Sequence, residues 1–403
     1  MNTLKFGNGE WYGKKDTILA YNDENSNFKP LPFSFDRASS ATRVNKDGLI
    51  ETVGSGEPRI DYKDDSKGAL LLEPTRSNLI TYSEDFTQWS DAGTPTVVLS
   101  SSLAPNGYLD AYDITDDSSG VYEIKRSNSA SFDGTYTMSI FVKKTTGALT
   151  HYAGVQFIGL SDYLIIDTTN GTVNQTASEY SNIKVEDFSN WWKISATGTN
   201  TGSTFLINLW AAISSNGTSL SPSAVGTNTF FGAQLEQGSY ATSYIPTQGA
   251  ISTKVAEICN GAGNNQVFND SDGAIFLNFA SYGDYVISLD NGTSTNRIQF
   301  FRTSTNDRIY IMIGGTFIIN EIYRGTSNGV YNKYALSYES GNILLYVNGS
   351  LLRTYTTPFT STPFSEFRLN QYDNNASVSL SLLEAKIYNT RLTNAELQAL
   401  TSN

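Results

Sequence analysis

Residues 331–350 read YNKYALSYESGNILLYVNGS, and this stretch decides the fold of the C-terminal part of the chain. Within it, Ile343, Leu345 and Val347 alternate with other residues, so their side chains lie on one face of a strand. Ser340-Gly341 separates two such runs, and Asn348-Gly349 follows the second. Dipeptides of this kind supply the left-handed residues of tight turns. The stretch therefore predicts two antiparallel strands with a tight turn at each boundary.

The same pattern recurs along most of the chain. Residues 135–142 place Tyr136, Met138, Ile140 and Val142 on one face, and Asn-Gly and Asp-Gly pairs separate many similar short runs. Helix signals are scarce, and the clearest is a capping box at Thr393–Glu396. These patterns predict an all-β protein built from antiparallel β-sandwiches of the jelly-roll kind.

Composition excludes several classes of function. The 403 residues include 27 basic and 39 acidic side chains, which gives a net charge of −12. A protein that binds nucleic acid needs a basic face, and an anionic membrane surface repels an acidic chain. Cys259 has no second cysteine for a disulfide, and the chain lacks the four Cys or His ligands of a structural zinc site. His151 is the single histidine, so any Ser-His-Asp or Cys-His catalytic device would have to use it.

The N-terminus carries no apolar signal-peptide region, and no apolar run is long enough to span a membrane. We therefore expect a chain that is made in a cytoplasm, does not leave through a signal peptide and does not insert into a membrane.

We divide the chain into three parts. Residues 1–80 alternate poorly in polarity and mix basic with acidic side chains, which predicts an irregular N-terminal arm that a partner orders. Residues 81–250 and residues 255–403 each carry many alternating segments, and each predicts one antiparallel β-sandwich.

The C-terminal part resembles the laminin-G/concanavalin-A-like lectin family. The likeness lies in the hairpin at 331–350, in the strand and helix at 385–400, and in the opening strand at 272–279. It implies a sandwich over residues 255–403. The Glu-x-Asp-x-x-Glu strand motif of the family's hydrolases is absent from this sequence. Some relatives bind calcium through loop oxygens, and the candidates here, for which ordinary turn chemistry is the alternative, are Asp284, Asp290 and Asn291.

The middle part resembles a carbohydrate-binding-module-like jelly roll found in bacteriophage virion proteins. The likeness lies in its opening NLITYSEDF at 78–86 and its closing FFGAQLEQGSYATSYIPT at 230–247. Sugar-binding jelly rolls stack exposed aromatic rings on sugar C–H faces. Adjacent strand residues face opposite ways, and we expect Trp192 inside and Trp191 nearer the surface. The candidate sugar platforms are Trp191, Trp210 and Tyr112.

The N-terminal part resembles the front of bacteriophage tail-fibre and head-fibre proteins. The likeness lies in FSFDRASSATRVNKDGLI at 33–50, PRIDY at 58–62 and GALLLEPTRSN at 68–78. It implies attachment to other phage structural proteins and assembly into a homotrimer. Four arginines can pair with Asp36, Asp61 and Glu73 or with the carboxylates of a neighbouring chain, and these are Arg37, Arg43, Arg59 and Arg76.

These observations and resemblances lead to one expectation of function. The chain is expected to be a structural protein of a phage virion, a head fibre or tail fibre, that presents glycan-binding β-sandwiches to the host surface. It is expected to have no catalytic activity and no cofactor other than a possible calcium ion. Two alternatives stay open, namely a polysaccharide hydrolase or lyase and a non-viral lectin or adhesin.

Overall fold

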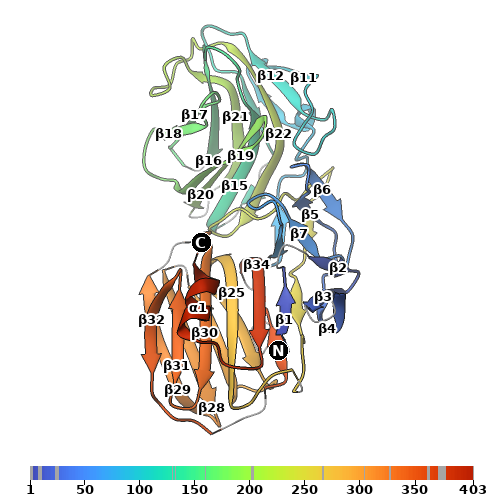
Figure 1. The fold of residues 1–403 in the computed structure, drawn as a ribbon. Helices are drawn as coiled ribbons and strands as arrows, with labels where there is room; N and C mark the ends of the chain where they lie inside the picture. The colour runs from blue at the N-terminus through green and yellow to red at the C-terminus, as the bar shows by residue number, and fades with distance from the viewer. Residues whose placement is uncertain are drawn as a thin grey trace. The chain divides into compact units, whose positions relative to one another are not determined.

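A computed structural model gives the fold of the chain (Figure 1). It describes residues 3–7, 11–22, 27–128, 130–131, 133–158, 160–200, 204–265, 267–303, 305–325, 328–360, 364–370 and 378–402. The regular elements of these residues are antiparallel strands, together with a 3₁₀ turn η2 (Phe86–Gln88) and the helix α1 (Asn394–Thr401), and turns and loops connect them. The all-β prediction is confirmed.

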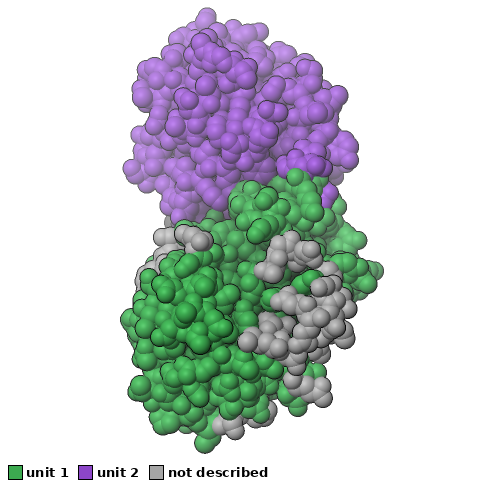
Figure 2. Space-filling view, in the orientation of Figure 1, with its two compact units in different colours: residues 1–46, 52–75, 255–403 green, residues 47–51, 76–254 purple. Residues whose placement is uncertain are grey.

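The described chain groups into two compact units, coloured separately in Figure 2. Unit 1 comprises residues 1–46, 52–75 and 255–403, and unit 2 comprises residues 47–51 and 76–254. The expected separate arm at 1–80 is therefore wrong, because most of its residues belong to the same compact unit as the C-terminal part.

Unit 2 is built from two sheets, and each takes its name from its central strand. The β21 sheet has the order β10 (Ser90–Ala92), β13 (Ile124–Arg126), β21 (Thr204–Ser214), β16 (Tyr152–Ile158), β17 (Leu164–Asp167) and β18 (Thr172–Gln175), and β14 (Ala130–Ser131) also pairs with β21. The β15 sheet has the order β11 (Thr96–Leu99), β12 (Tyr112–Asp116), β22 (Gly226–Gln237), β15 (Gly134–Lys143), β20 (Trp191–Asn200) and β19 (Ser181–Phe188). A short pair, β9 (Arg76–Asn78) and β23 (Ser252–Lys254), lies at the ends of the unit's main segment.

The two sheets of unit 2 share one apolar core. Tyr136, Met138, Ile140 and Val142, the face predicted from the sequence, are buried in it, together with Leu209 of the other sheet. Packing of the two sheets against each other therefore buries their inner faces. A ligand of this unit must bind on an outer face or at a loop.

Unit 1 also has two sheets around one core. The larger sheet runs through β24 (Ile258–Asn260), β4 (Asn27–Asp36), β3 (Thr17–Asn22), β1 (Thr3–Phe6), β34 (Ser379–Tyr388), β25 (Asp272–Tyr282), β30 (Asn332–Glu339), β31 (Ile343–Val347) and β32 (Ser350–Tyr355), with β2 (Tyr12–Lys14), β7 (Arg59–Asp61) and β8 (Ala69–Leu72) at its side. The second sheet runs through β29 (Thr316–Gly325), β28 (Asn306–Ile313), β27 (Arg297–Arg302), β26 (Tyr285–Asp290) and β33 (Glu366–Arg368). Strand β5 (Ala41–Val44) precedes the short segment 47–51 that belongs to unit 2, and the first two residues of β6 (Ile50–Val53) are part of that segment.

The N-terminal segment completes the C-terminal sandwich. Strand β1 pairs with β34 through Leu4 and Ile387, and β8 pairs with the same strand through Leu70 and Leu382. All four side chains are buried. The expectation that residues 1–80 are irregular and need a partner is therefore wrong, because the chain supplies its own partner strand more than 300 residues away.

The stretch 331–350 adopts the predicted strands and turns. Strands β30 and β31 pair through Leu336 and Leu345. After β31, Asn348 and Gly349 have φ values of 47° and 81°, the left-handed conformation that tight turns require. The predicted capping box is confirmed at the start of α1.

Candidate functional site

A pocket of about 250 Å³ lies on the outer face of the β21 sheet in unit 2. The strands that carry it, β13, β21, β16 and β17, lie side by side in one sheet, and β16, β17 and β21 are labelled in Figure 1. Its lining mixes aromatic, apolar and uncharged polar side chains with one arginine, and consists of Tyr122, Ile124, Arg126, Gln156, Tyr163, Asn208, Trp210, Ile213 and Leu220.

Strand register sets the floor of this pocket. Arg126 of β13 and Gln156 of β16 both lie directly opposite Asn208 of β21. One row further along, Ile124 lies opposite Trp210. Side chains two apart on a strand point to the same face, so these residues meet on the side of the sheet away from the core.

An irregularity in the sheet adds a further wall to the pocket. The register between β16 and β21 shifts between Tyr152 and Gly154, which pair with Ser214 and Trp210. Such a bulge re-aims the side chains of the longer strand. As a result Ile213 lies against Trp210 in one apolar cluster. The Ile213 side chain also covers the backbone of Gly154, because a Cβ atom added at Gly154 would lie 2.7 Å from Cβ of Ile213.

Several polar atoms of the lining are buried without a hydrogen-bond partner among the described residues. They are Nε of Arg126, Oδ1 of Asn208 and Nε1 of Trp210. The other end of the Asn208 amide is engaged, because its Nδ2 donates to Oε1 of Gln156 at 3.2 Å. A buried donor or acceptor that lacks a partner costs about 1–3 kcal/mol. Water or a ligand that supplied partners here would remove that cost.

The indole of Trp210 differs from the other indoles of the chain. The indole N–H groups of Trp11, Trp89, Trp191 and Trp192 each donate to a backbone carbonyl, at 2.8–3.1 Å. The N–H of Trp210 has no such acceptor in the described chain. All five tryptophans are described, and Trp210 is the one whose indole N–H has no hydrogen-bond acceptor among the described residues.

Aromatic rings form one side of the pocket. The rings of Tyr163 and Trp210 meet edge to face, with centroids 5.6 Å apart. Burial raises the pKa of the Tyr122 hydroxyl, and Tyr163 and Asp116 add to the shift. The phenol of Tyr122 therefore stays protonated and can donate. Both carboxylate oxygens of Asp116 accept from backbone amides, those of Ser118 and Glu123.

Of the three predicted sugar platforms, the structure brings Trp210 alone to the pocket. Trp191 and Trp210 are both buried, with 2% and 3% of their surface exposed, so neither ring is available as an exposed platform. Trp191 lies in a separate core cluster, whereas Trp210 belongs to the apolar cluster beside the pocket and contributes to the pocket lining. Tyr112 lies on β12 of the opposite sheet, where its ring meets Phe86. The expected orientation of the tryptophan pair is reversed, because Trp191 is the buried residue and Trp192 is partly exposed.

Sequence reasoning missed Arg126, Asn208 and Tyr163. They come from separate strands and a loop, and the alternation of β21 does place Asn208 and Trp210 together on one face. That alternation is the signal that could have linked Asn208 to the tryptophan. Nothing local could have linked Arg126, because its neighbour Asn208 lies 82 positions away.

The calcium candidates are spread over different local structures. Asp284 is exposed, and Asn291 accepts from the amide of Thr293 in a turn. Both oxygens of Asp290 are engaged inside the protein, by Arg368, Gly292 and Ser288. No group of three or more His, Cys, Asp or Glu in the described parts of the chain could hold a metal ion. Calcium binding by Asp284, Asp290 and Asn291 stays a prediction.

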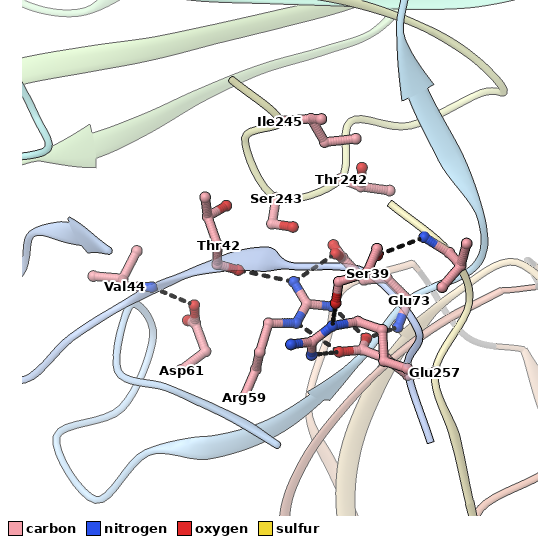
Figure 3. A network of polar contacts seen from close by, with 12 residues as sticks. Ser39, Thr42, Val44, Arg59, Asp61, Glu73, Thr242, Ser243, Ile245 and Glu257 are labelled. Atoms are coloured by element: carbon pink, nitrogen blue, oxygen red, sulfur yellow. Dashed lines mark hydrogen bonds and ion pairs between the residues drawn. The ribbon is translucent and has the colours of Figure 1, made fainter. Parts of the chain in front are cut away.

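Two of the four predicted arginines, Arg37 and Arg59, form a buried ion cluster within unit 1, and Figure 3 labels Arg59 with its partners Glu73 and Glu257. Arg59 donates to Oε2 of Glu73 at 2.9 Å and to both oxygens of Glu257, and Arg37 donates to Oε1 of Glu257 at 2.8 Å. Burial alone would lower the pKa of Arg59, but Glu257 and Glu73 together raise it above its ordinary value.

This ion cluster corrects the role expected for these arginines. The side chains of Arg37 and Arg59 have no exposed surface, so neither can reach a carboxylate of a neighbouring chain. Glu73 was predicted as a partner, but Glu257, which binds both arginines, was not. Asp61 instead accepts from the backbone amides of Val44 and Lys63.

The other two arginines lie elsewhere. Arg43 is half-buried on β5, and the guanidinium of Arg76 lies over the ring of Tyr240, 5.2 Å from its centroid.

No helix in the part of the chain that the structure describes is long and apolar enough to cross a membrane.

Comparison with other proteins gives weak likenesses. No family model matches the sequence, and neither does any curated protein. Among solved structures, the carbohydrate-binding module CBM40 of the Ruminococcus gnavus IT-sialidase is similar at 18% identity, with 35% of this chain and 93% of that chain covered and a TM-score of 0.30. Domain 4 of the arabinanase AbnA from Geobacillus stearothermophilus is similar at 14% identity over 41% of this chain and 84% of that chain, with a TM-score of 0.29.

The sialidase of Trypanosoma rangeli is similar at 9% identity over 96% of this chain and 65% of that chain, with a TM-score of 0.29. The assignment of a site therefore rests on the geometry of this chain alone.

Proposed function

We propose that this chain is a non-catalytic, glycan-binding structural protein of a bacteriophage virion, and that the pocket on the β21 sheet is its glycan site. The unpaired indole N–H of Trp210 carries this proposal, together with the unpaired carbonyl oxygen of Asn208 beside it. A sugar hydroxyl can donate and accept at once, so one or two neighbouring hydroxyls would satisfy both atoms. The rings of Tyr122 and Tyr163 would then meet the C–H face of the sugar.

The lining also favours binding over turnover. The pocket has no Asp or Glu among its described lining residues, whereas glycoside hydrolysis uses a pair of carboxyl groups on either side of the bond that breaks. A hydrolase that uses such a carboxyl pair would need a second site elsewhere on the chain.

The virion part of the proposal rests on the resemblances at 33–78, 78–86 and 230–247. A fibre presents many copies of each site on one particle, which raises the overall avidity without new contacts at any site. A homotrimer attached through its N-terminal segment would do this. With Arg37 and Arg59 occupied inside unit 1, attachment would have to use other surfaces of that segment.

A glycan array tests the pocket. The wild-type chain is expected to bind a defined set of glycans, and the variant Trp210→Phe is expected to bind the same set about fivefold to tenfold more weakly. The reason is that phenylalanine keeps an aromatic ring but removes a hydrogen bond worth about 1 kcal/mol. Trp192→Phe is the matched control, because its indole N–H already donates to the carbonyl of Thr168. Equal binding by wild type and Trp210→Phe would exclude this pocket as the site.

A further inference from the structure

We infer that the glycan bound in this pocket is acidic, with a sugar carboxylate held by Arg126. This inference rests on the proposed function and adds the ligand class to it. The pocket already offers partners for neutral hydroxyls through Asn208 and Trp210. These two residues can bind neutral hydroxyls without a charged group, so they give no role to the guanidinium of Arg126.

Arg126 has no acidic partner within the described chain. Its side chain is half-buried, its Nε is buried without a hydrogen bond, and it forms no ion pair with any described residue. Many other arginines of the chain do pair with carboxylates, for example Arg368 with Asp290 and Arg391 with Glu339.

The nearest strand neighbour does not supply the missing carboxylate. Strand β10 lies beside β13, and its residue opposite Arg126 is Ser90. The next residue, Asp91, lies opposite Lys125 and is bound by the Lys125 ammonium at 2.5 Å. Consecutive strand residues point to opposite faces, so this ion pair leaves the Arg126 side of the strand open to a ligand.

The pocket has the chemistry of a site for one acidic sugar residue. A guanidinium holds a carboxylate through two parallel hydrogen bonds, in a geometry that a single ammonium cannot match. No described lining residue is acidic, so nothing in the lining repels a negative ligand. At about 250 Å³ the cavity is smaller than the roughly 300–1,000 Å³ typical of sites for larger organic ligands. It suits a single sugar, with the rest of the glycan outside.

The test is an array of uronic-acid and nonulosonic-acid glycans, each paired with its carboxyl-reduced form and with a sulfated neutral analogue. The full chain is expected to bind its acidic ligands at least tenfold more tightly than the carboxyl-reduced forms. Arg126→Gln is expected to abolish that preference, and Arg126→Lys to keep part of it. Trp210→Phe is expected to weaken binding but to keep the preference, and Lys184→Gln on β19 of the opposite sheet is the control that should change neither.

The outcomes separate this inference from the proposed function. Equal binding of the acidic and carboxyl-reduced forms would overturn the acidic ligand and leave a glycan site. Equal binding of sulfated and carboxylated forms would overturn the inference that the bound group is a carboxylate. An unchanged preference in Arg126→Gln would overturn the inference that Arg126 binds it. If no glycan of any kind binds, the proposed function fails together with the inference.

Discussion

Replacing Glu257 by alanine is expected to lower the free energy of unfolding of unit 1 by about 3–5 kcal/mol. The carboxylate of Glu257 accepts from Nη1 of Arg37 at 2.8 Å, from Nε of Arg59 at 2.7 Å and from the backbone N–H of Glu73 at 2.8 Å. With Glu73, the four side chains carry two positive and two negative charges. Removing Glu257 leaves a buried guanidinium without its counter-charge, which costs far more than the loss of an ordinary surface pair.

Chemical denaturation followed by circular dichroism measures this loss. Asp187→Ala is the control, because Asp187 pairs with Lys144 at the surface of unit 2 and its loss should cost below about 1 kcal/mol. Glu257→Gln is expected to fall between the two, since glutamine keeps hydrogen-bonding atoms but not the charge. A Glu257→Ala variant as stable as Asp187→Ala would show that the cluster adds nothing to the fold.

A fragment of residues 255–403 is expected not to fold on its own. Without residues 1–75 the sheet loses β1 and β8, which pair with β34, and the core loses buried side chains such as Phe6, Phe33 and Leu70. Each large apolar side chain contributes about 1.5–3 kcal/mol by its burial. Several such losses together exceed the roughly 5–15 kcal/mol by which a domain is stable.

The fragment is compared with the same fragment co-expressed with residues 1–75. The fragment alone is expected to give a poorly dispersed NMR spectrum, and the co-expressed pair a dispersed one with cooperative thermal unfolding. A well-dispersed spectrum and a cooperative transition from 255–403 alone would show that the N-terminal strands are not needed to complete the sandwich.

Local signals explain which parts of the fold could be predicted. The hairpin at 331–350 and the capping box at Thr393 each depend on residues a few positions apart, and both are confirmed. Strand β1 could not be predicted as part of the C-terminal sheet, because its partner Ile387 lies 383 positions from Leu4. Short strands with weak alternation are specified by the sheet that they join.

The orientation of the tryptophan pair shows another limit. Alternation correctly indicates that Trp191 and Trp192 point to opposite faces of the sheet. It does not show that the face away from the main core is covered by a second apolar cluster. Trp191 packs in a separate cluster with Phe141 and Phe231, and Trp192 packs at the edge of the main core of unit 2. A residue on the face away from the main core can therefore be the more buried of the two.

The candidate site was predictable in part. Trp210 was predicted as an exposed sugar platform; it does line the pocket, but its side chain is buried. Its partners depend on which strands lie beside β21, and Arg126 and Gln156 reach it only through that pairing. The absence of an acceptor for the Trp210 indole within the described chain is a property of the folded state, and no sequence pattern encodes it.

The most direct test of the glycan site follows the indole N–H signals of the five tryptophans by NMR while the strongest glycan from the array is added. The Trp210 signal, assigned by its loss in Trp210→Phe, is expected to shift strongly downfield as its N–H gains an acceptor, while the four indoles that already donate to carbonyls move little. A Trp210 signal that stays in place at saturation would contradict the account.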